Sequence, residues 1–152
     1  MSANNPYHSA SSAYSDTSVA TDQRLLESRV LLKAAGKLDT LANRLEAGEK
    51  PTLAEIDEVL DYNRKLWLLF VSETMNDEHP LPQEIKNNIA SLGVFVFKRT
   101  LDILADTRHE KIRALVDINR NIASGLAKAA ANAAAAEAKA EAAERTPTDN
   151  MA

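Results

Sequence analysis

The feature that most constrains this fold is an apolar pattern whose residues are spaced three and four positions apart. This spacing places side chains on one face of an α-helix. It recurs in four stretches: Leu31, Ala34, Leu38, Leu41 and Leu45; Ile56, Leu60, Asn63, Trp67 and Phe70; Ile85, Asn88, Leu92 and Phe95; and Ile112, Leu115, Asn119, Ile122 and Leu126. The pattern predicts an all-α fold, a small bundle of about four helices.

The ends of the first two helices are marked by residues that suit helix termini. The first helix is predicted to begin near Thr21, a suitable N-cap, and to run to about Glu46. Thr52 and Glu55 then match a capping box, in which a hydroxyl and a carboxylate each satisfy a free backbone amide. A second helix is therefore predicted to begin directly after Thr52.

The third helix is predicted to run from about Pro82 to Ala105. A strand is the competing interpretation of LGVFVF at 92–97, but the flanking residues keep the helical period and favour a helix. Gly93 indicates a close helix crossing, because glycine costs about 1 kcal/mol of helix propensity. The fourth helix is predicted to begin at a second capping box, Thr107 to Glu110.

The two ends of the chain differ from its middle in composition. Residues 1–20 are rich in Ser, Ala and Asn and are predicted to form a disordered, flexible N-terminal tail. Residues 21–127 form the predicted helical domain. Residues 128–152 are rich in alanine, so we expect a helical extension that projects into solvent and ends near Pro147. A spacer or self-association arm is the alternative role for this extension.

Three asparagines, Asn63, Asn88 and Asn119, occupy positions within apolar stripes. A buried carboxamide without a partner costs roughly 1–3 kcal/mol, so each of them needs one. In the first interpretation they pair with one another or with backbone groups and fix the register of the helices. In the second they line a groove and bond a guest, with Arg64 and Arg120 at its edge.

The aromatic side chains raise the same choice between core and surface. Trp67, Phe70, Phe95 and Phe97 lie where all residues are apolar or small, at 66–71 and 92–97. Core packing is the ordinary interpretation, yet a helix of a small bundle needs only one apolar stripe. The surplus favours either a fully surrounded helix pair or an exposed groove. We expect more apolar area than the bundle can bury, available to a client.

Composition and motifs argue against several classes of function. The 152-residue chain has a net charge of −4 and a pI near 5.4, which weighs against nucleic acid as the main partner. It contains no cysteine, no histidine pair with metal-ligand spacing, no phosphate-binding loop and no nucleophile motif. We expect no enzymatic activity, cofactor or metal. Without a signal peptide or an apolar run of membrane-spanning length, a cytoplasmic location is predicted.

Specific sequence strings carry a family resemblance beyond the helical pattern. They are NPY at 5–7, LLKAAGKL at 31–38, LDYNRKLW at 60–67, HPLPQEIKNNIASLGVFVFKRTLDIL at 79–104 and DINRNIASGL at 117–126. Together they resemble the flagellar biosynthesis regulator FlaF family over about residues 5–126. The resemblance implies a bacterial flagellum biogenesis protein that promotes flagellin production and secretion, acts opposite the translational repressor FlbT, and binds flagellin as an export chaperone analogous in role to FliS.

The candidate partner-binding residues follow from position in this sequence. They are Asn63, Arg64, Trp67, Phe95, Phe97, Arg99, Asn119 and Arg120. The expected partner is flagellin, held through an amphipathic segment in a groove. The first alternative is a post-transcriptional regulator that acts through FlbT or the flagellin mRNA, for which the basic residues are Arg64, Lys65, Lys86, Lys98 and Arg99. The second alternative is a self-associating helical scaffold.

Overall fold

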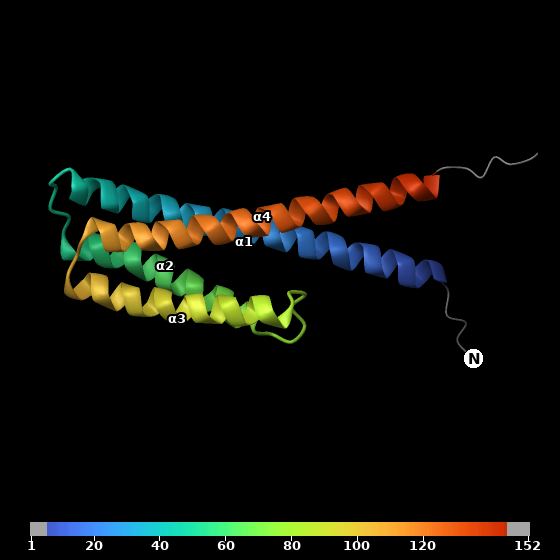
Figure 1. Cartoon of the computed structure of the whole chain (residues 1–152), viewed down its shortest axis with the longest axis horizontal. Helices are drawn as coiled ribbons and strands as arrows, with labels where there is room; N and C mark the ends of the chain where they lie inside the picture. Colours follow the sequence, from blue (N-terminus) through green and yellow to red (C-terminus); the bar gives the residue numbers. More distant parts are fainter. Residues whose placement is uncertain (1–5, 146–152) are drawn as a thin grey trace, which may run out of the picture.

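The computed structural model describes residues 6–145, and the side chains of residues 18–145, as four helices joined by short connections (Figure 1). The helices are α1 (Pro6–Glu46), α2 (Leu53–Thr74), α3 (Gln83–Ala105) and α4 (His109–Arg145). No strand occurs in this described range. The predicted all-α bundle of four helices is confirmed.

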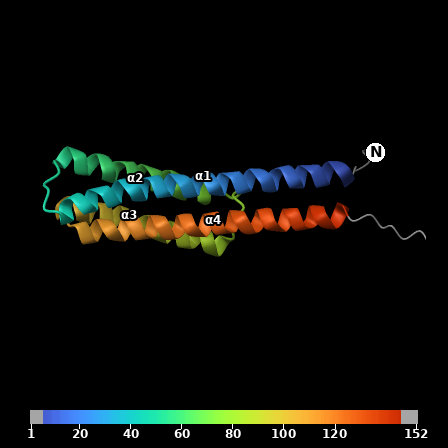
Figure 2. The same cartoon turned by 90° about the horizontal axis from the view of Figure 1, so that it is seen from above.

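Two long helices and one shorter hairpin make up the architecture. Helices α1 and α4 run antiparallel and form the most extensive contact in the molecule, and the α2–α3 hairpin lies along only part of their length (Figures 1 and 2). Beyond the hairpin, the N-terminal part of α1 and the C-terminal part of α4 extend in the same direction as a helix pair that diverges toward its end (Figure 1). The fold is therefore a four-helix bundle at one end and a helix pair at the other.

Small residues form the seam between α1 and α4. Ser28, Ala35 and Ala42 follow one another every seven residues on α1 and are buried, as are Ala123 and Ala130 on α4. Ser28 Oγ donates a hydrogen bond of 2.8 Å to the carbonyl oxygen of Ala123. Small side chains at heptad spacing allow two helix backbones to approach closely, which explains the extensive contact between α1 and α4.

The predicted stripes of three helices are confirmed as core. On α1, α2 and α4 the buried members are Leu31, Ala34, Leu38, Leu41, Ile56, Leu60, Asn63, Trp67, Phe70, Ile112, Leu115, Asn119 and Leu126. Leu45 and Ile122 are half-buried at the edge of this core. The predicted stripes of α1, α2 and α4 therefore face one another in the core of the bundle.

The predicted main stripe of α3 is wrong. The residues of α3 that are buried are Lys86, Ile89, Gly93, Val96, Thr100 and Ile103. Ile85 is instead 42% exposed, Phe95 is 39% exposed, and Asn88 is exposed. Ile89, Val96 and Ile103, which the sequence placed beside the main stripe, are the apolar residues that α3 buries.

A close crossing of α2 and α3 explains which side of α3 is buried. A Cβ atom built on Gly93 would lie 2.6 Å from Val71 Cγ2, so only glycine allows the two helices to pack this closely. The close crossing predicted at Gly93 is confirmed. Helix α3 leans on α2 and turns the line of residues 85–95 away from the core.

The starts of α2 and α3 agree with the sequence, and those of α1 and α4 differ. Pro82 is the N-cap of α3, and the helix ends at Ala105 as predicted. At α2 the capping box is confirmed, with Thr52 Oγ1 accepting from the Glu55 amide at 3.2 Å and the Thr52 amide donating to Glu55 Oε2 at 2.7 Å. The second capping box is wrong, because Thr107 Oγ1 donates to the Ile103 carbonyl at 2.9 Å and α4 begins at His109. The hydroxyl of Thr107 thus binds the end of α3 instead of the start of α4.

The first helix begins at Pro6, upstream of the predicted start at Thr21. Proline suits the first helical position, and neither proline nor glycine interrupts the chain between it and Thr21. Residues 1–5 of the predicted tail lie outside the described residues. The predicted helical extension is confirmed as far as Arg145, whereas its end near Pro147 also lies outside them.

Candidate partner-binding groove

An open groove runs between α3 and α4 and encloses about 480 Å³. Leu81, Ile85, Asn88, Ile89 and Leu92 line it from α3 and the connection before it, and Asn121, Ile122, Gly125, Leu126 and Ala129 line it from α4. Apart from two asparagines, every lining residue is aliphatic or small, and none is charged. We refer to these residues as the α3–α4 groove.

The groove exists because its two walls are held by different neighbours. Helix α3 is drawn to α2 at the Gly93–Val71 contact, and α4 is drawn to α1 at the Ser28–Ala123 hydrogen bond. The α3–α4 contact is accordingly the least extensive among the neighbouring helix pairs. The side of α3 that carries Ile85, Asn88 and Leu92 is therefore left without a helix packed against it.

The opposite end of the α3–α4 pair is closed. There the short connection to α4 brings Lys111 Nζ within 2.9 Å of Asp102 Oδ1 and 3.3 Å of Asp106 Oδ2. The hydrogen bond to Asp102 raises the pKa of Lys111, more than its partial burial lowers it. This ion pair joins the two helices near the connection, so the groove widens toward the start of α3.

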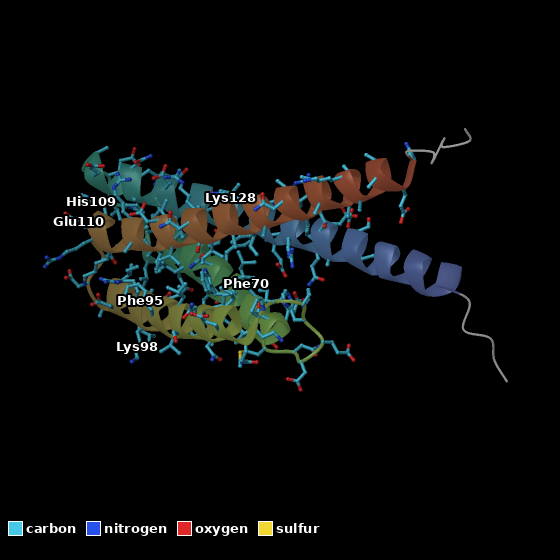
Figure 3. All side chains as sticks on the ribbon, turned by 45° about the vertical axis from the view of Figure 1, so that its right-hand side comes forward. Phe70, Phe95, Lys98, His109, Glu110 and Lys128 are labelled. Carbon is cyan, nitrogen blue, oxygen red and sulfur yellow. The ribbon has the colours of Figure 1, made fainter. Side chains whose placement is uncertain are left out.

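Phe95 lies on α3 beyond the residues that line the groove (Figure 3). It lies seven residues after Asn88 and so falls on the same side of the helix. The Arg99 guanidinium lies 5.1 Å from the centroid of the Phe95 ring, and Arg99 Nη1 lies 3.6 Å from Asp102 Oδ2. Phe95 and Arg99 of the predicted site therefore remain accessible beside the groove.

Three of the predicted site residues form a sealed network. Trp67 Nε1 donates to Asn119 Oδ1 at 2.7 Å, Asn119 Nδ2 donates to Asn63 Oδ1 at 2.7 Å, and all three residues are 0% exposed. Pairing with one another is thus the interpretation that holds for Asn63 and Asn119. The expectation that these three residues line a groove is wrong, because the folded core covers them.

The direction of this network follows from the indole, which can only donate. Its N–H fixes the Asn119 oxygen as acceptor and leaves the Asn119 amide group to donate to Asn63. Asn63 Nδ2 then has no hydrogen-bond partner among the described residues. One asparagine amide is left unsatisfied at the centre of the bundle.

The remaining predicted residues lie on other surfaces. Arg64 and Phe97 line a second groove between α2 and α3, which encloses about 330 Å³ and includes Leu68 and Leu101. Arg120 Nη2 lies 3.4 Å from Asp39 Oδ2 of α1, at the α1–α4 seam. Three of the eight predicted residues therefore lie in the core, two in the α2–α3 groove, two on α3 beside the α3–α4 groove and one at the α1–α4 seam, so they do not form a single site.

None of the eight predicted site residues is among those that line the α3–α4 groove, and Asn88, which does line it, was predicted to lie in the buried stripe. The available signal was the presence of two apolar lines on the third helix, 85–88–92–95 and 89–96–103. A helix of a small bundle buries one such line, so a second line indicates a surface for a partner. The predicted site was instead centred on aromatic residues, including the buried Trp67.

Residues 6–145 hold neither a metal-binding group nor a membrane-spanning helix. No group of three or more His, Asp or Glu side chains there could hold a metal ion. Nor does any helix in this range combine the length and apolarity needed to cross a membrane.

Comparison with known proteins gives one match. A family model described as flagellar protein FlaF matches residues 10–126. No curated protein and no solved structure gives a match. The matched segment holds all of the groove residues except Ala129, and it spans most of the chain. The chain therefore belongs to the FlaF family of flagellar proteins.

Proposed function

We propose that this chain binds flagellin in the cytoplasm as a non-enzymatic export chaperone and so promotes flagellin production and secretion. The observation that carries the proposal is the α3–α4 groove, an open and uncharged apolar surface on a protein of a flagellar family. Flagellin has amphipathic terminal segments that associate in the filament, and their apolar faces need a cover before export. An amphipathic helix laid in a hydrophobic groove is a common mode of such recognition.

The apolar area left open contributes to binding. Fully burying a large apolar side chain contributes roughly 1.5–3 kcal/mol. Ile85 and Phe95 each keep about two-fifths of their surface exposed, so covering them contributes about 1 kcal/mol apiece. Contacts with the half-buried Leu92 and Ile122 add to this, against the cost of ordering the client segment.

The proposal is tested by titrating the full chain with purified monomeric flagellin. Ile85→Lys places a charge in the α3–α4 groove and is expected to weaken binding at least tenfold, with Phe95→Ala having a smaller effect. Leu101→Lys is the matched control, because Leu101 is 68% exposed and lies in the other groove. Circular dichroism checks that each variant keeps its helix content. A wild-type chain that binds no flagellin would overturn the proposal.

A second candidate function is control of flagellin synthesis through FlbT. The observation in its favour is the α2–α3 groove, where Leu68 is 55% exposed and Leu101 is 68% exposed beside Asp57, Asp61 and Arg64. Leu101→Lys would then weaken FlbT binding and leave flagellin binding intact. If Leu101→Lys instead weakened flagellin binding and left FlbT binding intact, the α2–α3 groove would have no role in FlbT binding.

Direct binding to the flagellin message is less well supported. Among the basic residues suggested for it, Arg64 and Lys65 both pair with Asp61, and these contacts lower the pKa of Asp61, with Lys65 as the larger cause. Lys86 is buried and donates to the Asn76 carbonyl at 2.7 Å. Phosphate binding depends on cations that are free to replace counterions, and these three of the five suggested basic residues are already engaged within the protein.

A further inference from the structure

We infer that the α3–α4 groove selects a helix whose apolar stripe is bordered by uncharged amide or hydroxyl side chains, and that Asn88 and Asn121 are the residues that select it. This inference rests on the proposed function, since it names the class of flagellin segment that the same groove takes. It concerns specificity, and it extends to residues that the sequence analysis did not place in the site.

The first support is the absence of charge from the lining. Every residue that lines the groove is aliphatic, small or an asparagine. A charged side chain of a client that faced this surface would lose its water and gain no counter-ion, which is unfavourable. The lining therefore favours a client whose stripe and borders are uncharged.

The second support is the pair of asparagines, one from each wall. Asn88 comes from α3 and Asn121 from α4, both are exposed, and neither has a side-chain hydrogen bond within the described part of the chain. A carboxamide both donates and accepts, so its natural complement is another amide or a hydroxyl. In the free protein water satisfies both groups; under a client that lacks such partners they would be left unsatisfied. Because of this penalty, the two asparagines discriminate against a client whose apolar stripe lacks amide or hydroxyl side chains at its borders.

The shape of the groove supports a helix as its occupant. Its walls are two helices that separate, so a further helix between them completes the packing of the bundle. A Cβ atom on Gly125 would have nothing within 4 Å, which shows open space beside the α4 backbone. A second copy of the chain offers the same concave surface, and two such surfaces cannot fill each other.

The decisive variant replaces both asparagines by isosteric acids, Asn88→Asp with Asn121→Asp, in the full chain. Binding of monomeric flagellin is expected to weaken at least tenfold. Asn87→Asp is the control for each new carboxylate, because it adds one negative charge on α3 one residue from Asn88, outside the groove lining, and its carboxylate can still accept from Gln83 Nε2 as Asn87 Oδ1 does. That control is expected to bind within twofold of wild type. Equal binding of flagellin by wild type and the double variant would overturn the inference and leave the proposed function standing.

A second probe separates the two proposals. Two synthetic helical peptides share one leucine stripe, bordered by glutamine and serine in one and by glutamate and lysine in the other. The wild-type chain is expected to bind the first at least tenfold more tightly by fluorescence anisotropy. If it does so but binds no flagellin, the inference stands and the proposed function fails. Equal binding of both peptides, or a self-association that the double variant abolishes, would overturn the inference.

Discussion

Trp67 of α2 and Asn119 of α4 are joined across the bundle by a hydrogen bond of 2.7 Å from the indole Nε1 to the carboxamide oxygen. Their helices are not packed against each other, since α2 contacts α1 and α3, and α4 contacts α1 and α3. The side chains therefore connect two diagonal helices through the core. This explains why an asparagine stands in the apolar stripe of each of these helices.

Removal of this link is expected to destabilise the fold. Asn119→Ala leaves the indole N–H and the Asn63 oxygen buried without a partner and opens a small cavity, which should lower the free energy of unfolding by about 2–4 kcal/mol. Chemical denaturation monitored by circular dichroism measures the change. Asn121→Ala, two residues away and exposed in the groove, should leave stability within about 0.5 kcal/mol of wild type. Equal losses in both variants would contradict the role of the buried network.

Gly93 is expected to be essential to the α2–α3 crossing. In Gly93→Ala the added methyl group would lie 2.6 Å from Val71 Cγ2, and relieving this overlap should cost about 1–3 kcal/mol. Gly36→Ala is the control, because a Cβ there meets nothing within 4 Å, and alanine should stabilise that helical position by up to about 1 kcal/mol. Thermal unfolding distinguishes the two. Partial rescue by Val71→Ala would identify the overlap as the cause.

Glu27 is expected to make stability depend on pH with a defined sign. Its side chain is only 10% exposed, and burial raises its pKa above the ordinary 4.5, against the lowering effect of His79, whose Nε2 lies 3.7 Å away. A raised carboxyl pKa means that its stabilising contribution is full below about pH 4.5 and is lost as the pH rises through the folded value. Glu27→Gln should therefore match wild type at pH 4 and exceed its thermal midpoint at pH 7.5.

Glu55 supplies the opposite case for that experiment. Its pKa is lowered by the hydrogen bond from the Thr52 amide and by Arg44, so its contribution is present at neutral pH and lost on acidification. Glu55→Gln should accordingly reduce the midpoint at pH 7.5 and not at low pH. A shift of the same sign in both glutamine variants would contradict these assignments.

Flagellin binding is expected to depend weakly on salt. The α3–α4 groove carries no charge, so the dissociation constant should change less than about threefold between 50 and 300 mM salt. A chain that used six or more phosphate contacts would lose about a thousandfold or more in affinity over a comparable range. Titration calorimetry with flagellin, and a gel shift with the message leader at both salt concentrations, compare the two directly. Strongly salt-sensitive binding of the leader would favour the regulatory alternative.

The sequence by itself determined the number of helices, the start of α2 and the crossing at Gly93. Each of these depends on local chemistry: spacing along one helix, a hydroxyl and a carboxylate three residues apart, and a missing side chain. The sequence strings that resemble the FlaF family are also a property of the sequence alone, and the match to the FlaF family model confirms this resemblance. The start of α1 was less well defined, because no break in residues 7–20 fixes it.

Only the tertiary structure decided which apolar line of α3 is buried and which asparagines pair. Both lines of α3 are equally good helical stripes, so spacing cannot choose between them. The choice depends on the rotation of α3 about its axis, which the Gly93–Val71 contact with α2 sets. The same rotation leaves Asn88 in an open groove, while Asn63 and Asn119 meet in the core. A helix's rotation is fixed by its neighbours, and those neighbours are far away in the sequence.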